Sequence, residues 1–131
     1  MRPVQARAAA ALLFAAALSA GLPHPALALE SCPAKSADER LSMIAAAPGC
    51  KAASHINDLC VEASGADTQA TEAVIARCEK DFMASAPKSQ IAAYKKDRAA
   101  CEQKYAGQAG AVFGSVTGYC VAHAAVRYSG R

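Results

Sequence analysis

The amino-acid sequence predicts an all-α protein, a small helical bundle of four to five helices that is stapled by disulfides. Apolar residues recur at helical spacing in several segments, and no segment alternates strictly between apolar and polar residues as a strand would. The chain has six cysteines, an even number, and all of them follow an export-type N-terminal segment. From residue 29 onward alanines outnumber all Val, Ile, Leu, Met, Phe and Tyr residues together, so the apolar core is thin and needs covalent support.

Residues 1–28 have the layout of a secretory signal peptide. Arg2 and Arg7 give a positive start, and residues 8–20 form an apolar run that is short for a membrane span. Ala26-Leu27-Ala28 matches the small-x-small pattern of a cleavage site. We therefore expect the chain to be exported and this segment to be removed.

Residues 29–131 are expected to form a single helical, disulfide-rich domain that is periplasmic or secreted. Without the two arginines of the signal peptide the formal charge falls from +3 to +1, which gives no electrostatic footprint for nucleic acid or anionic membrane. A lipoprotein is the alternative, because Leu29-Glu30-Ser31-Cys32 partly matches a lipidation box. Glu30 stands where a small or apolar residue is usual, and lipidation of Cys32 would leave an odd number of cysteines, so we favour the unlipidated form.

Caps and helix breakers set the expected helix boundaries. Ser36 and Glu39 form the S-x-x-E pattern of a capping box, and Pro48-Gly49 ends the helix that this box begins. The next expected helices run from Lys51 to Ala63, from Asp67 or Thr68 to Ala84, and from Pro87 to Tyr105.

The last segment, residues 111–128, allows two interpretations. Apolar residues recur there at helical spacing, but Gly114 and Gly118 each cost a helix about 1 kcal/mol relative to alanine. Either the glycines let another helix approach closely, or the helix starts only near Val116 after a Gly/Ser loop. We slightly favour the second interpretation.

Cysteine spacing suggests which thiols pair. The nearly equal intervals favour pairing of neighbours in sequence, which gives Cys32–Cys50, Cys60–Cys78 and Cys101–Cys120. Because six cysteines allow many other combinations, this connectivity is a hypothesis.

No catalytic, cofactor or metal site is expected. The chain has no Cys-x-x-Cys motif, and an even cysteine count argues against a free catalytic thiol. His55 and His123 each stand near cysteines and give the alternative of a small metal-binding protein, which we disfavour because bridged thiols are poor ligands. Arg98 and Arg127 are the candidate structural residues near the Cys101–Cys120 bridge. Arg98 either covers the core with its aliphatic stem or pairs with an acid or with helix C-terminal carbonyls, and spacing alone leaves both alternatives open.

The segment from Cys60 to Arg127 resembles the LprI-like lysozyme-inhibitor family (the DUF1311 domain). The resemblance rests on Asp97-Arg98-Ala99-Ala100-Cys101, a Gly/Ser-containing segment, and Cys120 followed by Arg127. It implies a small, exported, helical and disulfide-bonded protein, with a first cysteine pair at Cys60 and Cys78. The Asp-Arg order and the missing tryptophan depart from the family pattern, and the resemblance assigns no inhibitory residue.

The expected function is therefore that of an exported, non-enzymatic binding protein, with a lysozyme-type muramidase as candidate partner. The alternative is a periplasmic structural or envelope-stress accessory protein. Because lysozymes are usually basic, an acidic binding face would favour the lysozyme-binding function over the accessory function. The formal charge of +1 does not distinguish the two. The sequence assigns no oligomeric state.

Overall fold

The computed structural model describes residues 30–130, so the expected signal peptide and its cleavage site lie outside the described residues. Residues 30–130 form five helices and no strand, which confirms the predicted all-α class. The helices are α1 (Ala37–Ala46), α2 (Cys50–Leu59), α3 (Gly65–Phe82), α4 (Lys88–Lys104) and α5 (Ala111–Ser129). None of these helices combines the length and the apolar character that a membrane span requires.

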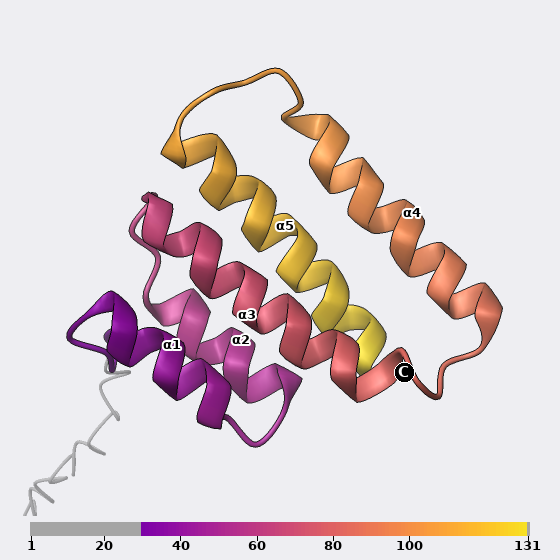
Figure 1. Ribbon diagram of the computed structural model, residues 1–131, viewed down its shortest axis with the longest axis horizontal. Helices are drawn as coiled ribbons and strands as arrows, with labels where there is room; N and C mark the ends of the chain where they lie inside the picture. Colours follow the sequence, from indigo (N-terminus) through magenta and orange to yellow (C-terminus); the bar gives the residue numbers. More distant parts are fainter. Residues whose placement is uncertain (1–29, 131) are drawn as a thin grey trace, which may run out of the picture.

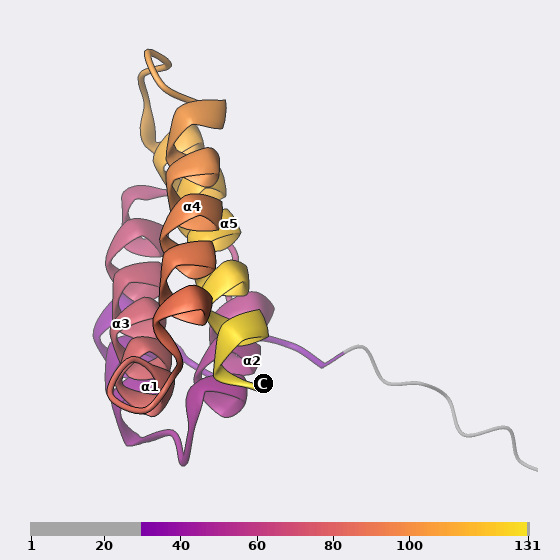
Figure 2. The same ribbon diagram turned by 90° about the vertical axis from the view of Figure 1, so that its right-hand side faces the viewer.

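Helix α3 is the centre of the bundle, since it packs against α1, α2 and α5 (Figures 1 and 2). Helix α4 lies at the edge of the bundle, where its backbone runs beside that of α5 and meets α3 through side chains. At one end of the bundle the rings of Phe82, Tyr94 and Tyr128 join α3, α4 and α5, with ring centroids 5.1 Å apart for Phe82–Tyr94 and 5.6 Å apart for Tyr94–Tyr128. The other buried core positions hold alanine, cysteine, isoleucine or valine, with alanine the most frequent, so the core is as thin as the composition predicts.

The N-terminal ends of α1 and α2 are capped in different ways. Ser36 Oγ accepts a hydrogen bond from Glu39 N at 3.2 Å, as the capping-box pattern predicts, while Glu39 reaches back to Lys35 N at 2.7 Å. Helix α2 has no side-chain cap of its own. Asp81 of α3 takes that role, because its Oδ2 accepts from Cys50 N at 2.9 Å.

Two predicted boundaries around the α2–α3 loop are wrong. Helix α2 ends at Leu59 rather than Ala63, because the backbone turns there and Ala63 takes a φ of 54°, which no helix accommodates. Helix α3 begins at Gly65 with Ser64 as its N-cap, rather than at Asp67 or Thr68. Asp67 is instead the third residue of the helix, and its side chain points into the protein.

The favoured interpretation of the last segment is also wrong, since α5 begins at Ala111 and runs through both glycines. A Cβ on Gly118 would clash with the side-chain oxygen of Thr71 and lie 3.0 Å from its Cβ, and one on Gly114 would lie 3.3 Å from Thr68 Oγ1. The glycines therefore let α5 approach α3 closely, and this packing outweighs their low helix propensity.

All six cysteines are bridged, as Cys32–Cys60, Cys50–Cys78 and Cys101–Cys120. The expected pairs Cys32–Cys50 and Cys60–Cys78 are thus wrong, and so is the Cys60–Cys78 pair that the family resemblance implies. Helices α2 and α3 are antiparallel, so Cys50 at the start of α2 lies beside Cys78 near the end of α3. Along α3, Cys78 lies about 20 Å from the α2–α3 turn and therefore cannot reach Cys60, which stands at that turn. With its sulfur bonded to Cys60, Cys32 has no free thiol for a lipid anchor.

Candidate binding surface

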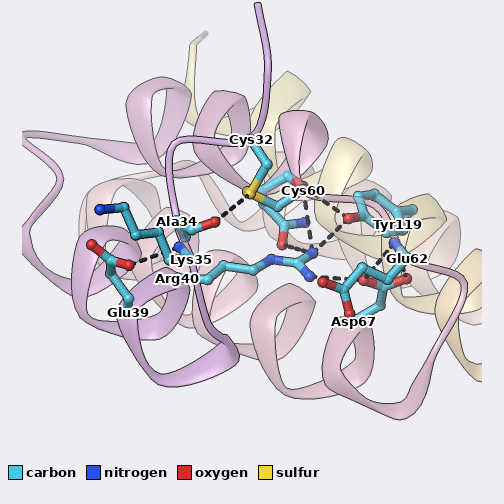
Figure 3. Close-up of a disulfide and its surroundings, with 10 residues drawn as sticks. Cys32, Ala34, Lys35, Glu39, Arg40, Cys60, Glu62, Asp67 and Tyr119 are labelled. Atoms are coloured by element: carbon cyan, nitrogen blue, oxygen red, sulfur yellow. Dashed lines mark hydrogen bonds and ion pairs between the residues drawn. A yellow bond between two sulfur atoms is a disulfide. The ribbon is translucent and has the colours of Figure 1, made fainter.

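A buried polar network centred on Arg40 holds the α2–α3 loop in place (Figure 3). The Arg40 side chain is 3% exposed, and its Nη1 donates to Asp67 Oδ1 at 2.8 Å. Its Nη2 donates to Asn57 Oδ1 at 2.7 Å and to Tyr119 OH at 2.7 Å. One guanidinium of α1 therefore connects α2, α3 and α5, which is more than a surface ion pair would do.

Asp67 is fully buried and is the anionic centre of this network. Besides Arg40, it accepts hydrogen bonds from Ser115 Oγ at 2.7 Å and from the backbone N–H groups of Glu62 and Ser64 at 3.3 Å and 3.4 Å. Burial pushes the pKa of the Asp67 carboxyl upward, but the hydrogen bonds from Ser115, Arg40 and Glu62 together bring that pKa below its ordinary value. Asp67 thus stays ionised and fixes the conformation of residues 61–64.

The network underlies an exposed apolar face, which we call the valine face and define by Val61, Val112 and Val116. Val61 is 55% exposed, Val112 52% and Val116 37%, and they are the large hydrophobic residues left exposed over residues 30–130. Val61 follows Cys60, the C-cap residue of α2, while Val112 and Val116 lie one turn apart on α5. Exposed apolar residues that cluster in one patch, unlike scattered ones, are typical of a binding surface.

A shallow hollow of about 670 Å³ lies in this face. Tyr119 and Ser115 of the buried network form part of its lining, together with Val61 and Val116. The hollow therefore rests on groups that the network holds rigidly, and a partner would meet a surface that needs little reordering on binding.

The charges around the hollow are acidic. Asp58 is in the lining and Glu62 stands between two lining residues of the α2–α3 loop, whereas the lining contains no Lys or Arg. His123 also lines the hollow, and its Nε2 lies 2.9 Å from Asp58 Oδ1. A basic partner would be attracted to this rim and a strongly acidic one repelled.

Two disulfides anchor the valine face from opposite sides. Cys60, bonded to Cys32, comes immediately before Val61, and Cys120, bonded to Cys101 of α4, lines the hollow. The bridges restrict the backbone on both sides of the face, which makes its geometry depend on oxidation.

The structure places Arg98 away from the valine face. Arg98 Nη1 lies 3.0 Å from Glu79 Oε1 and its Nε 3.1 Å from Glu102 Oε1, so it pairs with acids instead of only covering the core. Tyr94 OH donates to the same Glu79 oxygen at 2.7 Å. Burial and the Glu79 carboxylate raise the pKa of the Tyr94 hydroxyl far above its ordinary value, so Tyr94 remains a neutral donor there.

Arg127 makes a looser contact. Its Nη2 lies 3.8 Å from Asp97 Oδ2, its side chain is 55% exposed, and it shares a shallow depression with Cys101 and Cys120. Arg127 therefore lies near the Cys101–Cys120 bridge, as the sequence suggests, whereas Arg98 is directed to Glu79 and Glu102, and the structure does not bring the two arginines together in one site.

The histidines hold no metal-type cluster. His55 Nε2 lies 2.9 Å from Glu30 Oε2, His123 pairs with Asp58, and within residues 30–130 no three His, Cys, Asp or Glu residues gather as ligands would. Ser54 Oγ lies 3.4 Å from Asp58 Oδ2, so the carboxylate stands between the serine and His123. A hydrolytic triad requires the imidazole in that middle position, so these residues cannot act as one.

Sequence reasoning missed the residues that build this surface. From the sequence, Asp67 is only a possible start of the third helix and Arg40 is not singled out, and nothing in their spacing connects them. Only the Ser64-x-x-Asp67 pattern, a capping box at the true start of α3, could have located one member.

Comparisons with known proteins return no family model, no curated protein and no solved structure that matches this chain. Within residues 30–130, the three disulfides are typical of proteins from an oxidising compartment.

Proposed function

We propose that this protein is an exported binding protein whose partner is a lysozyme-type muramidase, held through the valine face. The observation that carries the proposal is that Val61, Val112 and Val116 gather on one face beside acidic groups. An apolar centre with an acidic rim is complementary to a basic protein surface. The partner class itself comes from the resemblance of residues 60–127 to the LprI-like lysozyme-inhibitor family.

Binding rather than catalysis suits the chemistry of the face. Its lining groups are mainly apolar, and His123 Nε2 lies 2.9 Å from Asp58 Oδ1. The side chains of Tyr119 and Ser115 already make hydrogen bonds within the buried network. The three bridges hold this surface in one shape, which lowers the entropy that a complex must overcome.

The test is a titration of the oxidised protein into a turbidity assay of lysozymes acting on bacterial cell walls. Unmodified protein should inhibit in a dose-dependent manner, and protein with reduced disulfides should not. The variant Val61→Lys/Val116→Lys should bind at least about tenfold more weakly, because it places two cations against a basic partner. Ala92→Lys/Ala93→Lys, at two exposed positions of α4, adds the same two charges elsewhere and should inhibit normally.

Failure to inhibit several lysozymes, by protein with all three bridges verified, would overturn the muramidase assignment. Equal inhibition by the valine-face variant and the α4 control would instead overturn the assignment of the face. In the first case the accessory-protein reading becomes the better account.

A further inference from the structure

A second concave site lies on the other side of α5 from the valine face. It is a cavity of about 320 Å³ between α3, α4 and α5, which we call the α3–α4 cleft. The backbone of α4 runs beside α5 and stands apart from that of α3 (Figure 1), and α3 meets α4 through longer side chains, as in the Phe82–Tyr94 and Glu79–Arg98 contacts. This separation leaves room for the cleft. Gly114 and Gly118 line the cleft and allow α5 to pack closely on α3. Helix α4 has no such close approach to α3.

The walls of the cleft offer both donors and acceptors of hydrogen bonds. Glu72 and Glu102 supply carboxylate oxygens, while Arg98 and the amide of Gln108 supply N–H groups. The carboxylate of Glu72 has no hydrogen bond or ion pair among the described residues, and neither does the hydroxyl of Thr117. The polar groups of the cleft are therefore only partly used within the protein.

An aromatic wall completes the cleft at the end nearest the α4–α5 loop. The rings of Tyr105 and Phe113 have centroids 6.4 Å apart and planes 40° apart, and both line the cavity. Such rings offer flat apolar faces beside polar groups, which is a surface suited to a ligand that is apolar on one face and polar at its edge.

Charge narrows the class of ligand. In the lining, Glu72 and Glu102 outnumber the single cation Arg98, and Arg98 already pairs with Glu102 and with Glu79 beyond the lining, so the cleft disfavours an anion. A wholly apolar ligand would leave these charged groups desolvated without partners. A neutral ligand with several hydroxyl groups satisfies both signs, because each hydroxyl can donate to a carboxylate and accept from an N–H group.

We propose that the α3–α4 cleft binds a neutral pyranose ring. Glu72 and Glu102 accept hydrogen bonds from the sugar hydroxyls, Arg98 donates to one of them, and the C–H face of the ring packs on Tyr105 and Phe113. The volume is near the lower limit of small-molecule sites, about 300–1,000 Å³, so one ring fits rather than an oligosaccharide. This proposal does not depend on the muramidase proposal, which concerns the opposite side of α5.

The test uses ¹⁵N-labelled, oxidised protein titrated with D-glucose, D-galactose and N-acetyl-D-glucosamine, with choline as an organic-cation probe. At least one sugar should give saturable amide shifts confined to the residues of the cleft, with a dissociation constant on the order of 1 mM. Glu72→Ala, an exposed position whose loss should not unfold α3, should weaken that binding about tenfold because one charged acceptor is lost. Val116→Lys should leave sugar binding unchanged and affect only the valine face.

Three results would overturn the proposal. They are the absence of saturation with every sugar, saturation by choline with no response to sugars, and sugar binding that Glu72→Ala leaves intact. Because the valine-face variant and the cleft variant report on separate surfaces, failure here is distinguishable from failure of the muramidase proposal.

Discussion

Replacement of Asp67 by asparagine tests whether the buried network holds the fold together. In the native protein Asp67 accepts from Arg40 at 2.8 Å and from Ser115 at 2.7 Å, and both residues are almost completely buried. Asparagine would place an amide group where one carboxylate oxygen stood, so a donor would face a donor. Arg40 would then keep its charge in the interior without a counter-ion.

Removal of one partner from a buried ion pair costs about 3–5 kcal/mol. A small domain has a total stability of about 5–15 kcal/mol, so the loss is a large share of it. Since 1 kcal/mol moves the midpoint of a domain of this size by about 4–8 °C, Asp67→Asn should lower Tm by at least about 12 °C. Urea unfolding of the oxidised protein, followed by circular dichroism, gives the free energy directly.

Asp38→Asn is the matched control, because Asp38 is exposed in the first turn of α1 and its side chain makes no ion pair or hydrogen bond with the described residues. It should change the free energy of unfolding by no more than about 0.5 kcal/mol. A loss for Asp67→Asn as small as that for Asp38→Asn would refute the reasoning, since the buried pair would then contribute nothing. The double variant Arg40→Met/Asp67→Leu should lose less than the sum of its single changes, because neither charge is left alone.

Three further outcomes follow from other contacts. The pKa of the Asp67 carboxyl in the folded protein is below its ordinary value of 3.8, so the ionised carboxylate contributes its full stability above pH 3.8. That contribution is lost as pH falls through the folded pKa. The difference in free energy of unfolding between wild type and Asp67→Asn should therefore decrease in acid. Gly118→Ala should lower the free energy of unfolding by about 1–3 kcal/mol, because the added Cβ clashes with α3. Gly65→Ala, whose Cβ would meet no atom within 4 Å, should be neutral or stabilising. Equal changes in the two variants would contradict the close approach of α5 to α3. Arg98→Ala should cost about 1 kcal/mol because its pairs are only partly buried, while Arg127→Ala should leave Tm unchanged; an unchanged Tm for Arg98→Ala removes any structural role for that residue.

The parts of the fold that depend on residues close together in the sequence could be predicted from the sequence. Ser36 and Glu39 are close in the chain, so their capping box identifies the start of α1 without knowledge of the rest. The start of α5 was not predictable in this way. Its glycines are costly by intrinsic propensity, and only the threonines that α3 presents to them make the helix favourable.

The candidate surface depends on contacts between residues that are far apart in sequence. Arg40 meets Tyr119 only because α1, α2 and α5 converge, and no periodicity within α1 reports that convergence. Val61 and Val116 likewise read as ordinary apolar residues until the structure shows that both remain exposed on one face. The predicted pairs Cys32–Cys50 and Cys60–Cys78 are wrong for the same reason, since the antiparallel order of α2 and α3 decides the pairing there. The predicted Cys101–Cys120 pair is confirmed.

The connectivity of the first four cysteines has a consequence for biosynthesis. Cys32–Cys60 and Cys50–Cys78 each enclose a loop with a sequence separation of 28, and each loop contains one cysteine of the other bridge. A chain oxidised as it emerges N-terminus first offers Cys32 and Cys50 to the oxidant together, which favours a non-native pair. Correct maturation then requires thiol–disulfide exchange, so we expect refolding of the reduced protein to accelerate strongly when a disulfide isomerase is added. If the isomerase has no effect, the helices must assemble before oxidation and select the interlocked pairs themselves.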